Sequence, residues 1–326
     1  MTKKGILFFL LRISIAVGLV VWLISSDKID FSILFGSKFG WGWALLSLST
    51  YLIIIFIATF RWQLLLNAQE IKVPFKILLR LTFIGWFFNI SMPGATGGDV
   101  IRAYYASLLS PEKKTESVTV VFFDRFIGLS AMALLSFIVA GLYILIAPAV
   151  ETIKMLFAGV TLSLFLLFLF LCLVISRYAE NSKLLKWCKT HLPFGGIFEK
   201  AHDSLILYKS KKKILLLSVL VSLAAHVIMT YSNYLFAVAL DMEVVSFLRF
   251  LFLIPVGLFI DCIPISIAGI GWGEAAYGAL FPLAGYAAKL GICIAALMHC
   301  AKIIWAIPGL FLYLGGRKHY KKPVAT

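Results

Sequence analysis

The sequence predicts an all-α polytopic membrane protein, and its composition and the form of its apolar runs carry this prediction. Of its 326 residues, 62% are hydrophobic and 14% are charged, and the mean hydropathy is +1.00. A soluble domain is nearer to about half apolar and about a quarter charged. The apolar runs are continuous, whereas the strands of an outer-membrane barrel alternate apolar and polar residues, so a barrel is excluded.

The long apolar runs predict six full membrane crossings. A crossing helix needs about 20 apolar residues, and runs of that kind lie at residues 6–25, 43–66, 117–146, 152–175, 214–240 and 289–315. Two further apolar regions, 77–108 and 248–287, are each interrupted by Pro and Gly. We therefore predict about six full transmembrane helices plus two re-entrant hairpins, with eight full spans as the alternative.

The two interrupted regions share one pattern: a polar residue, then Pro, then clustered Gly, then an acid. The first runs from Asn89 to Asp99 and the second from Asp261 to Glu274. Lipid cannot satisfy the backbone groups that Pro and Gly release, so such breaks survive only inside protein or beside a watery cavity. A pair of broken segments in the two halves of a chain points to a transporter binding site. The predicted break residues are Pro93, Gly97, Gly98, Pro264, Gly269, Gly271 and Gly273.

The formal net charge of +15 fits a membrane topology with both termini in the cytoplasm. If the first broken region is re-entrant, the cytoplasmic side holds 22 of the 30 Lys and Arg residues, as expected for the inner membrane. The first hairpin then enters from the cytoplasm and the second from outside, which is an inverted pair. Nucleic acid is excluded as a partner, because no soluble basic domain is present to bind it.

One sizeable loop, residues 177–213, carries nine Lys and Arg residues. Its apolar residues recur near helical spacing, which predicts short helices lying on the inner leaflet of the membrane. A plain topology signal is the alternative interpretation.

The sequence indicates no cofactor and no metal site. The five Cys residues form no C-x-x-C pair, so neither a disulfide nor a zinc site is indicated. No motif of a soluble catalytic domain is present.

Several charges lie inside apolar segments, where each costs roughly 2.5–3.5 kcal/mol on insertion scales. Such residues face a bundle interior or a cavity and mark functional sites. The candidate substrate-binding residues are Arg61, Asn89, Asp99, Arg102, Asp124, Arg125, Glu274 and Lys302.

Asp99 and Glu274 close the two broken segments, and two interpretations of them are open. They cap the helices that follow, or they line a polar cavity from opposite sides. Arg102 lies one turn after Asp99, so the two can pair; it either grips a lipid phosphate or snorkels to the interface. Arg61 is interpreted as an interfacial anchor.

The remaining candidates need partners on other segments. Asp124 and Arg125 are adjacent and point about 100° apart on a helix, so they cannot simply pair with each other. We expect Asp124 to pair with Arg102. Lys302 lies near the middle of the last span, and Glu274 is its expected partner. Asn89 is expected to satisfy backbone groups freed by the break, as is Asp261 at the second break.

At these residues the chain resembles the lysylphosphatidylglycerol synthase/flippase transmembrane family, also called the flippase-like domain family. The matching motifs, in chain order, are Arg61-Trp62-x-x-Leu65-Leu66, Pro93-Gly94-x-x-Gly97-Gly98-Asp99-x-x-Arg102, Asp124-Arg125-x-x-Gly128 and Pro264-x-Ser266-x-x-Gly269-x-Gly271-x-x-Glu274. The resemblance implies a single transmembrane flippase-like domain over residues 1–326 that handles an anionic phospholipid or a polyprenyl-linked lipid.

In larger members of that family, this domain moves an aminoacylated lipid between leaflets, and a separate soluble domain makes that lipid. The chain ends eleven residues after Gly315, so we expect a stand-alone member that lacks the synthase domain. The first hypothesis is therefore a lipid flippase, a transporter rather than an enzyme. The alternatives are a membrane-embedded transferase acting on a lipid carrier, and a scaffold for a separately encoded lipid synthase.

Overall fold

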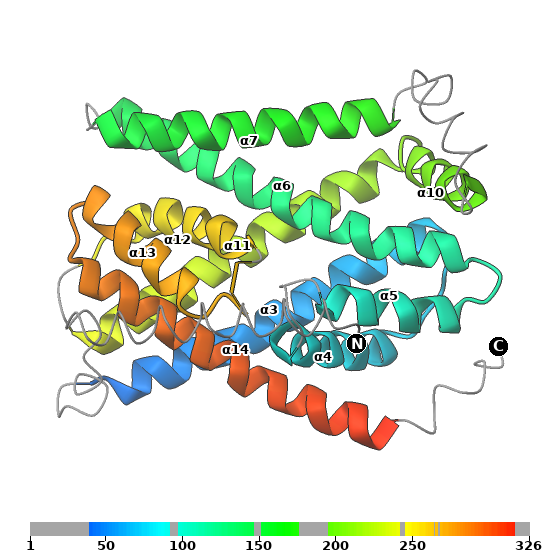
Figure 1. The fold of residues 1–326 in the computed structure, drawn as a ribbon, viewed down its shortest axis with the longest axis horizontal. Coiled ribbons are helices and arrows are strands. Elements are labelled where there is room, and N and C mark those ends of the chain that lie inside the picture. Colours follow the sequence, from blue (N-terminus) through cyan, green and yellow to red (C-terminus); the bar gives the residue numbers. More distant parts are fainter. Residues whose placement is uncertain are drawn as a thin grey trace, which may run out of the picture.

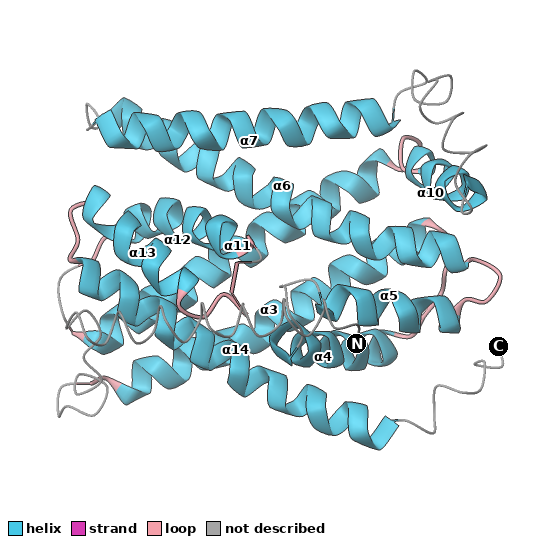
Figure 2. Cartoon of the chain, in the orientation of Figure 1, coloured by secondary structure: helices cyan, strands magenta, loops and turns pink. Residues whose placement is uncertain are grey.

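The computed structural model describes residues 39–91, 97–146, 151–175, 195–241, 245–263, 265–266 and 268–316. Every regular element within these residues is an α-helix (Figure 2). In chain order the helices are α3 (Trp41–Ala68), α4 (Phe75–Ser91), α5 (Gly97–Leu109), α6 (Lys114–Ile146), α7 (Glu151–Ile175), α10 (Gly195–Leu207), α11 (Lys212–Leu240), α12 (Phe247–Asp261), α13 (Trp272–Leu283) and α14 (Ala288–Gly316).

Four of these helices are long and apolar enough to cross a membrane. They are α3, α6, α11 and α14, and they coincide with the predicted crossings at 43–66, 117–146, 214–240 and 289–315. The predicted crossing at 152–175 is the continuous helix α7, which contains a shorter apolar stretch, Lys154–Leu169. The predicted crossing at 6–25 lies outside the described residues. The chain is thus a multi-pass membrane protein whose described part is all-helical.

Each interrupted region forms a pair of short helices. Helices α4 and α5 lie in the first region and α12 and α13 in the second, and the members of each pair contact each other. Figure 1 places the two pairs in opposite halves of the bundle along its long axis, while α3, α6, α11 and α14 pass through both halves. The tip of the first pair, which includes Pro93, lies outside the described residues, as does Pro264 in the second tip.

Glycine allows the chain to turn between α12 and α13. Gly269 and Gly271 have φ angles of +81° and +80°, in the left-handed region that only glycine adopts without steric cost. Gly271 is the N-cap residue of α13. Its backbone N–H donates to the carboxylate of Glu274, in the first turn of that helix, at 2.6 Å. The capping interpretation of Glu274 is therefore correct.

Each half of the bundle has its own hydrophobic core. One core, around Tyr51, Phe250 and Tyr277, joins α12 and α13 to the neighbouring parts of α3, α6, α11 and α14. The other, around Trp62 and Leu81, joins α4 and α5 to the other ends of α3 and α6. Helix α14 contacts both α13 and α4. Both short pairs are thereby held against the same long helices. The end of α4 and the start of α5 face the middle of the bundle, as do the end of α12 and the start of α13 (Figure 1).

A short helix does form within the basic segment 177–213. Helix α10 packs against α6 and α7, and just after it the hydroxyl of fully buried Tyr208 donates to the Leu65 carbonyl at 2.9 Å. Gln69 donates to the Ser204 carbonyl at 2.7 Å. These bonds fix α10 to the end of α3. Its position on the inner leaflet stays a prediction.

Candidate functional site

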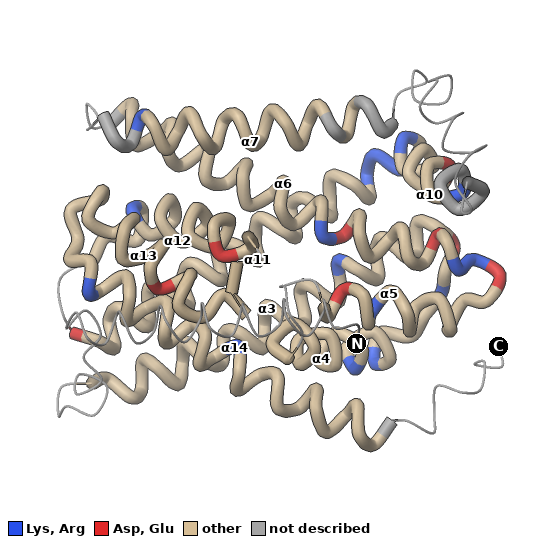
Figure 3. The backbone as a smooth tube through the Cα atoms, viewed as in Figure 1, with Lys and Arg blue, Asp and Glu red and all other residues tan. Residues whose placement is uncertain are grey.

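Five charged residues from three helices form a cluster in the half of the bundle that contains α4 and α5. This arginine cluster consists of Arg61 on α3, Asp99 and Arg102 on α5, and Asp124 and Arg125 on α6. Figure 3 shows charged positions partway along the long axis of the bundle as well as near its ends. Charges at such depth are tolerated where they pair with one another.

Asp124 is the centre of the arginine cluster. Its Oδ1 accepts from Arg61 Nε at 2.6 Å, and its Oδ2 lies 3.4 Å from Arg102 Nη2. The expected pairing of Asp124 with Arg102 is therefore correct. Arg102 also lies 3.3 Å from Asp99, as expected for residues one turn apart, and its guanidinium lies 4.1 Å from the centre of the Trp62 ring.

Arg61 is a largely buried ion-pair partner whose side chain bonds within the bundle, which differs from its interpretation as an interfacial anchor. Its side chain is 13% exposed, and besides Asp124 it donates to the hydroxyl of Ser222 on α11 at 2.8 Å. A Cβ atom at Gly128 would lie 3.1 Å from its Nη1, so the absence of a side chain there makes room for the guanidinium. The sequence could not show this, because the partner on α6 is 63 residues away.

Asn89 connects the two helices of the first short pair. Its Oδ1 accepts from the backbone N–H of Gly98 at 2.7 Å, so it satisfies a backbone group at the start of α5, as expected. A Cβ at Gly98 would overlap the Gly85 backbone. Glycine at this position is thus required for α4 and α5 to approach each other closely.

A second cluster lies where the other short pair meets α14. This histidine cluster consists of Asp261 at the end of α12, Glu274 at the start of α13, and His299 and Lys302 on α14. Lys302 donates to Asp261 Oδ2 at 2.8 Å, and His299 Nδ1 lies 2.8 Å from Glu274 Oε1. The other ring nitrogen of His299 lies 3.6 Å from Asp261 Oδ1.

The expected pairing of Lys302 with Glu274 is therefore wrong. Glu274 Oε2 accepts from the backbone N–H of Gly271, and its other carboxylate oxygen, Oε1, lies within hydrogen-bond distance of His299 Nδ1. Lys302 lies one turn after His299 and pairs with Asp261 instead. The sequence-based list of binding residues left out both Asp261 and His299. The one-turn spacing of His299 and Lys302 was the available signal for the histidine.

The predicted break glycines near this cluster make space for its side chains. A Cβ at Gly269 would overlap the Asp261 carboxylate, and one at Gly273 would lie 2.8 Å from His299 Cε1. Both glycines therefore allow the backbone between α12 and α13 to close around the two side chains.

Two adjoining cavities connect the clusters. The first, of about 250 Å³, is lined by all five residues of the arginine cluster together with Asn89 and His226. The second, of about 230 Å³, is lined by Asp261 and Lys302. The residues that line both are Trp86, Asn89, Arg125, Met229, Leu258 and Cys262.

Seven of the eight predicted binding residues line these cavities, and Glu274 does not. The side chain of Glu274 is 6% exposed and lies behind Asp261 and His299. Cys262, which the sequence-based list omitted, lies 3.8 Å from Arg125 in the shared part. Among the described residues, no group of His, Cys, Asp and Glu is arranged to hold a metal ion.

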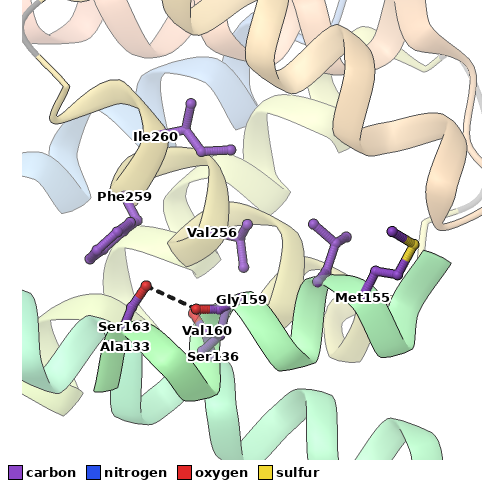
Figure 4. A pocket seen from close by; sticks show the side chains of 10 residues that line it. Ala133, Ser136, Met155, Gly159, Val160, Ser163, Val256, Phe259 and Ile260 are labelled. Carbon is purple, nitrogen blue, oxygen red and sulfur yellow. Dashed lines mark hydrogen bonds between the residues drawn. The ribbon is translucent and has the colours of Figure 1, made fainter. Parts of the chain in front are cut away.

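A third, apolar pocket of about 240 Å³ lies between α6, α7 and α12 (Figure 4). Its lining includes Ala133, Gly159, Val256 and Phe259, and Ser163 turns its hydroxyl to the carbonyl of Gly159. The apolar pocket shares no lining residue with the polar cavities, although α6 and α12 contribute residues to both the pocket and the first cavity. On α12, for example, Leu258 lines the cavities and the next residue, Phe259, lines the pocket.

The profile of one protein family, described as the lysylphosphatidylglycerol synthase transmembrane region, matches residues 9–309 of the chain. Comparisons with curated proteins and with solved structures gave no match. The family match covers every described helix except the end of α14, and thus both clusters and both cavities.

Proposed function

The chain belongs to the lysylphosphatidylglycerol synthase transmembrane family, and from this membership we propose that it is a lipid flippase. In this proposal it moves an anionic phospholipid, an aminoacylated phospholipid or a polyprenyl-linked lipid between the leaflets of the cytoplasmic membrane. Membership itself implies interaction with membrane lipid. The observation that supports a transport function is the pair of adjoining polar cavities between the tips of α4–α5 and α12–α13.

The proposed path depends on the two short helix pairs being re-entrant hairpins that enter from opposite sides of the membrane. Their positions in opposite halves of the bundle support this arrangement (Figure 1). A cavity between two inverted hairpins lies near the middle of the bilayer, where alternating-access transporters bind substrate. A headgroup there would face the arginine cluster from one leaflet and the histidine cluster from the other.

In this proposal the acyl chains occupy the apolar pocket between α6, α7 and α12. The pocket shares no lining residue with the polar cavities, but Met132 and Leu258 of the first cavity are each followed in the sequence by a residue of the pocket. A lipid could therefore keep its chains in an apolar surrounding while its headgroup passes through the polar one, since burial of apolar chains is favourable.

The geometry supports a transporter more than a transferase. A general base must be available to accept a proton from the substrate. Here Asp124 is held by Arg61 and Arg102, Asp261 by Lys302, and Glu274 by His299. These three carboxylates are engaged in pairs with basic side chains, which disfavours a role as general base in a transferase. The scaffold alternative is disfavoured for another reason, since a scaffold for a separate synthase would not need the cavity.

The test is transport of a fluorescent phosphatidylglycerol in liposomes that contain the purified protein. The wild type is compared with the double variant Asp99→Asn/Glu274→Gln and with Glu70→Gln, which removes an acid that is 81% exposed. We expect the double variant to lose at least tenfold in rate and Glu70→Gln to match the wild type. Unfolding temperature in detergent shows whether the double variant is folded. Full transport by a folded double variant would contradict this mechanism.

A further inference from the structure

The three arginines of the arginine cluster are not equivalent. Arg61 and Arg102 make their shortest ionic contacts at 2.6 Å and 3.3 Å, whereas the carboxylate nearest to Arg125 is Asp99 at 3.7 Å. The exposed fractions of the three side chains are 13%, 11% and 33% in the same order. Arg125 is thus the most accessible of the three and has the longest contacts.

Arg125 is also the arginine that faces both cavities. Arg61 and Arg102 line only the first cavity, while Arg125 lines the first and the second. It therefore stands at the junction through which a headgroup would pass from one cluster to the other. Its neighbours at the junction, Asn89 and Cys262, carry no formal charge.

Among the described residues, the charges that line the cavities leave one positive charge in excess. In the first cavity, three arginines face two aspartates. In the second, Lys302 and Asp261 form a pair at 2.8 Å and add no net charge. His226 lines the first cavity and bonds the Gly128 carbonyl through Nε2, for which a neutral imidazole suffices. Glu274 and His299 line neither cavity.

Arg125 shares its nearest carboxylate, Asp99, with Arg102 and contacts it only at 3.7 Å. A guanidinium that is only partly compensated inside a cavity attracts an anion, and its planar fork binds two phosphate oxygens at once. We infer that Arg125 binds the phosphate of the transported lipid, and that the cavity selects a headgroup with one net negative charge. A phosphodiester without an attached amine fits this charge. Zwitterionic and net-cationic aminoacyl headgroups do not. This inference rests on the proposed function and narrows its substrate class.

The first test is lipid selection by the purified protein. The protein is equilibrated in mixed micelles with equal amounts of phosphatidylglycerol, phosphatidylcholine and synthetic lysylphosphatidylglycerol that have the same acyl chains, and retained lipid is measured by native mass spectrometry. We expect wild type to retain phosphatidylglycerol at least fivefold over the other two. Arg125→Gln should lose this preference, and Arg125→Lys should keep part of it because the charge is retained.

Lys76→Gln serves as the matched control, because it removes an exposed cation from the same half of the bundle. It should retain the wild-type preference. Equal preference in Arg125→Gln and wild type would overturn the role of Arg125. Preferential retention of lysylphosphatidylglycerol by the wild type would overturn the charge rule.

The second test uses Cys262, which lies 3.8 Å from Arg125 and lines both cavities. Anionic and cationic methanethiosulfonates of similar size are applied to the unmodified chain, and modification of the Cys262 peptide is measured for each. We expect the anionic reagent to be favoured in wild type, and the ratio of the two rates to fall roughly tenfold in Arg125→Gln. An unchanged ratio would contradict an anion site at Arg125.

The same thiol identifies the source of the anion. Short-chain phosphatidylglycerol should protect Cys262 from the reagents, and inorganic phosphate at the same concentration should not. Equal protection by inorganic phosphate would contradict a lipid site. These measurements need no transport. If the protein binds the lipid but does not move it, the role of Arg125 stands and the proposed flippase function is contradicted.

Discussion

The two short helix pairs are built on the same Pro/Gly break, yet they are held in the bundle by different means. The start of α5 is satisfied from outside by Asn89 on α4, whereas the start of α13 is satisfied by its own Glu274. The charges of the first pair are tied to α3 and α6 through Asp124. In the second pair, Asp261 and Glu274 are bonded to α14, through Lys302 and His299.

This difference teaches that a shared sequence pattern fixes the break but not the electrostatics around it. The arginine cluster has three basic and two acidic side chains, while the histidine cluster pairs Asp261 with Lys302 and Glu274 with His299. Substitutions that act differently on the two clusters test this comparison.

The largest effect is expected from Arg61→Met. Removal of one partner of a buried ion pair typically costs about 3–5 kcal/mol, because the other charge is left buried, and here Asp124 would lose its contact at 2.6 Å. The free energy of unfolding in mixed micelles measures this cost. Lys302→Met should cost less, since Lys302 is more exposed and His299 remains beside Asp261. An equal loss of unfolding free energy in Arg61→Met and Lys302→Met would contradict the proposed difference between the clusters.

A smaller effect is expected from Gly269→Ala in the second tip. The alanine would be held at a positive φ angle, in the left-handed region, and its Cβ would overlap the Asp261 carboxylate. Backbone strain and overpacking together should cost about 2–3 kcal/mol. Gly159→Ala is the control, because a Cβ there meets no atom within 4 Å. In the middle of a helix it should be neutral or stabilising by up to about 1 kcal/mol. Equal unfolding free energies for the two variants would contradict the packing at Gly269.

Most of the fold was predictable because apolar length is a local property of the sequence. The ranges 43–66, 117–146, 214–240 and 289–315 each correspond to a long apolar helix. The breaks were predictable for the same reason, since Pro and Gly act on their own backbone. The depth at which each short pair lies in a membrane depends on the surrounding lipid, and it stays a prediction.

The site was predictable residue by residue but not in its pairing. A charge inside an apolar run is visible in the sequence, and Asp99 with Arg102 follows from helical spacing. The pairing of Arg61 with Asp124 depends on how α3 crosses α6, and that of Lys302 with Asp261 on how the tip of α12 meets α14. No local sequence pattern shows how two helices cross. The sequence therefore predicted an interfacial environment for Arg61 and Glu274 as the partner of Lys302, and the structure shows other partners for both.

An effect of about 1 kcal/mol is expected from Asn89→Ala. The substitution removes the acceptor at 2.7 Å from the Gly98 N–H, and loss of a helix N-terminal acceptor typically costs about 0.5–2 kcal/mol. Asn89→Asp keeps an acceptor at the same position and should restore most of the unfolding free energy. Since α13 carries its own cap, hydrogen exchange should increase at the start of α5 and stay unchanged at the start of α13. Faster exchange at both starts would show that the two pairs are coupled more tightly than their separate caps suggest.

The smallest effect is expected from Glu70→Gln, at the loop after α3. Glu70 is 81% exposed and lies 3.5 Å from Lys113, which is 41% exposed. Solvent screens such a pair, so its loss should change the free energy of unfolding by less than about 0.5 kcal/mol. The acidic interior counterpart, Asp124→Asn, removes a carboxylate that is 3% exposed and binds two arginines, and it should cost several times more. If both substitutions had the same small effect, the arginine cluster would not depend on its buried carboxylate, and the contrast between the two short pairs would have to be sought in their caps alone.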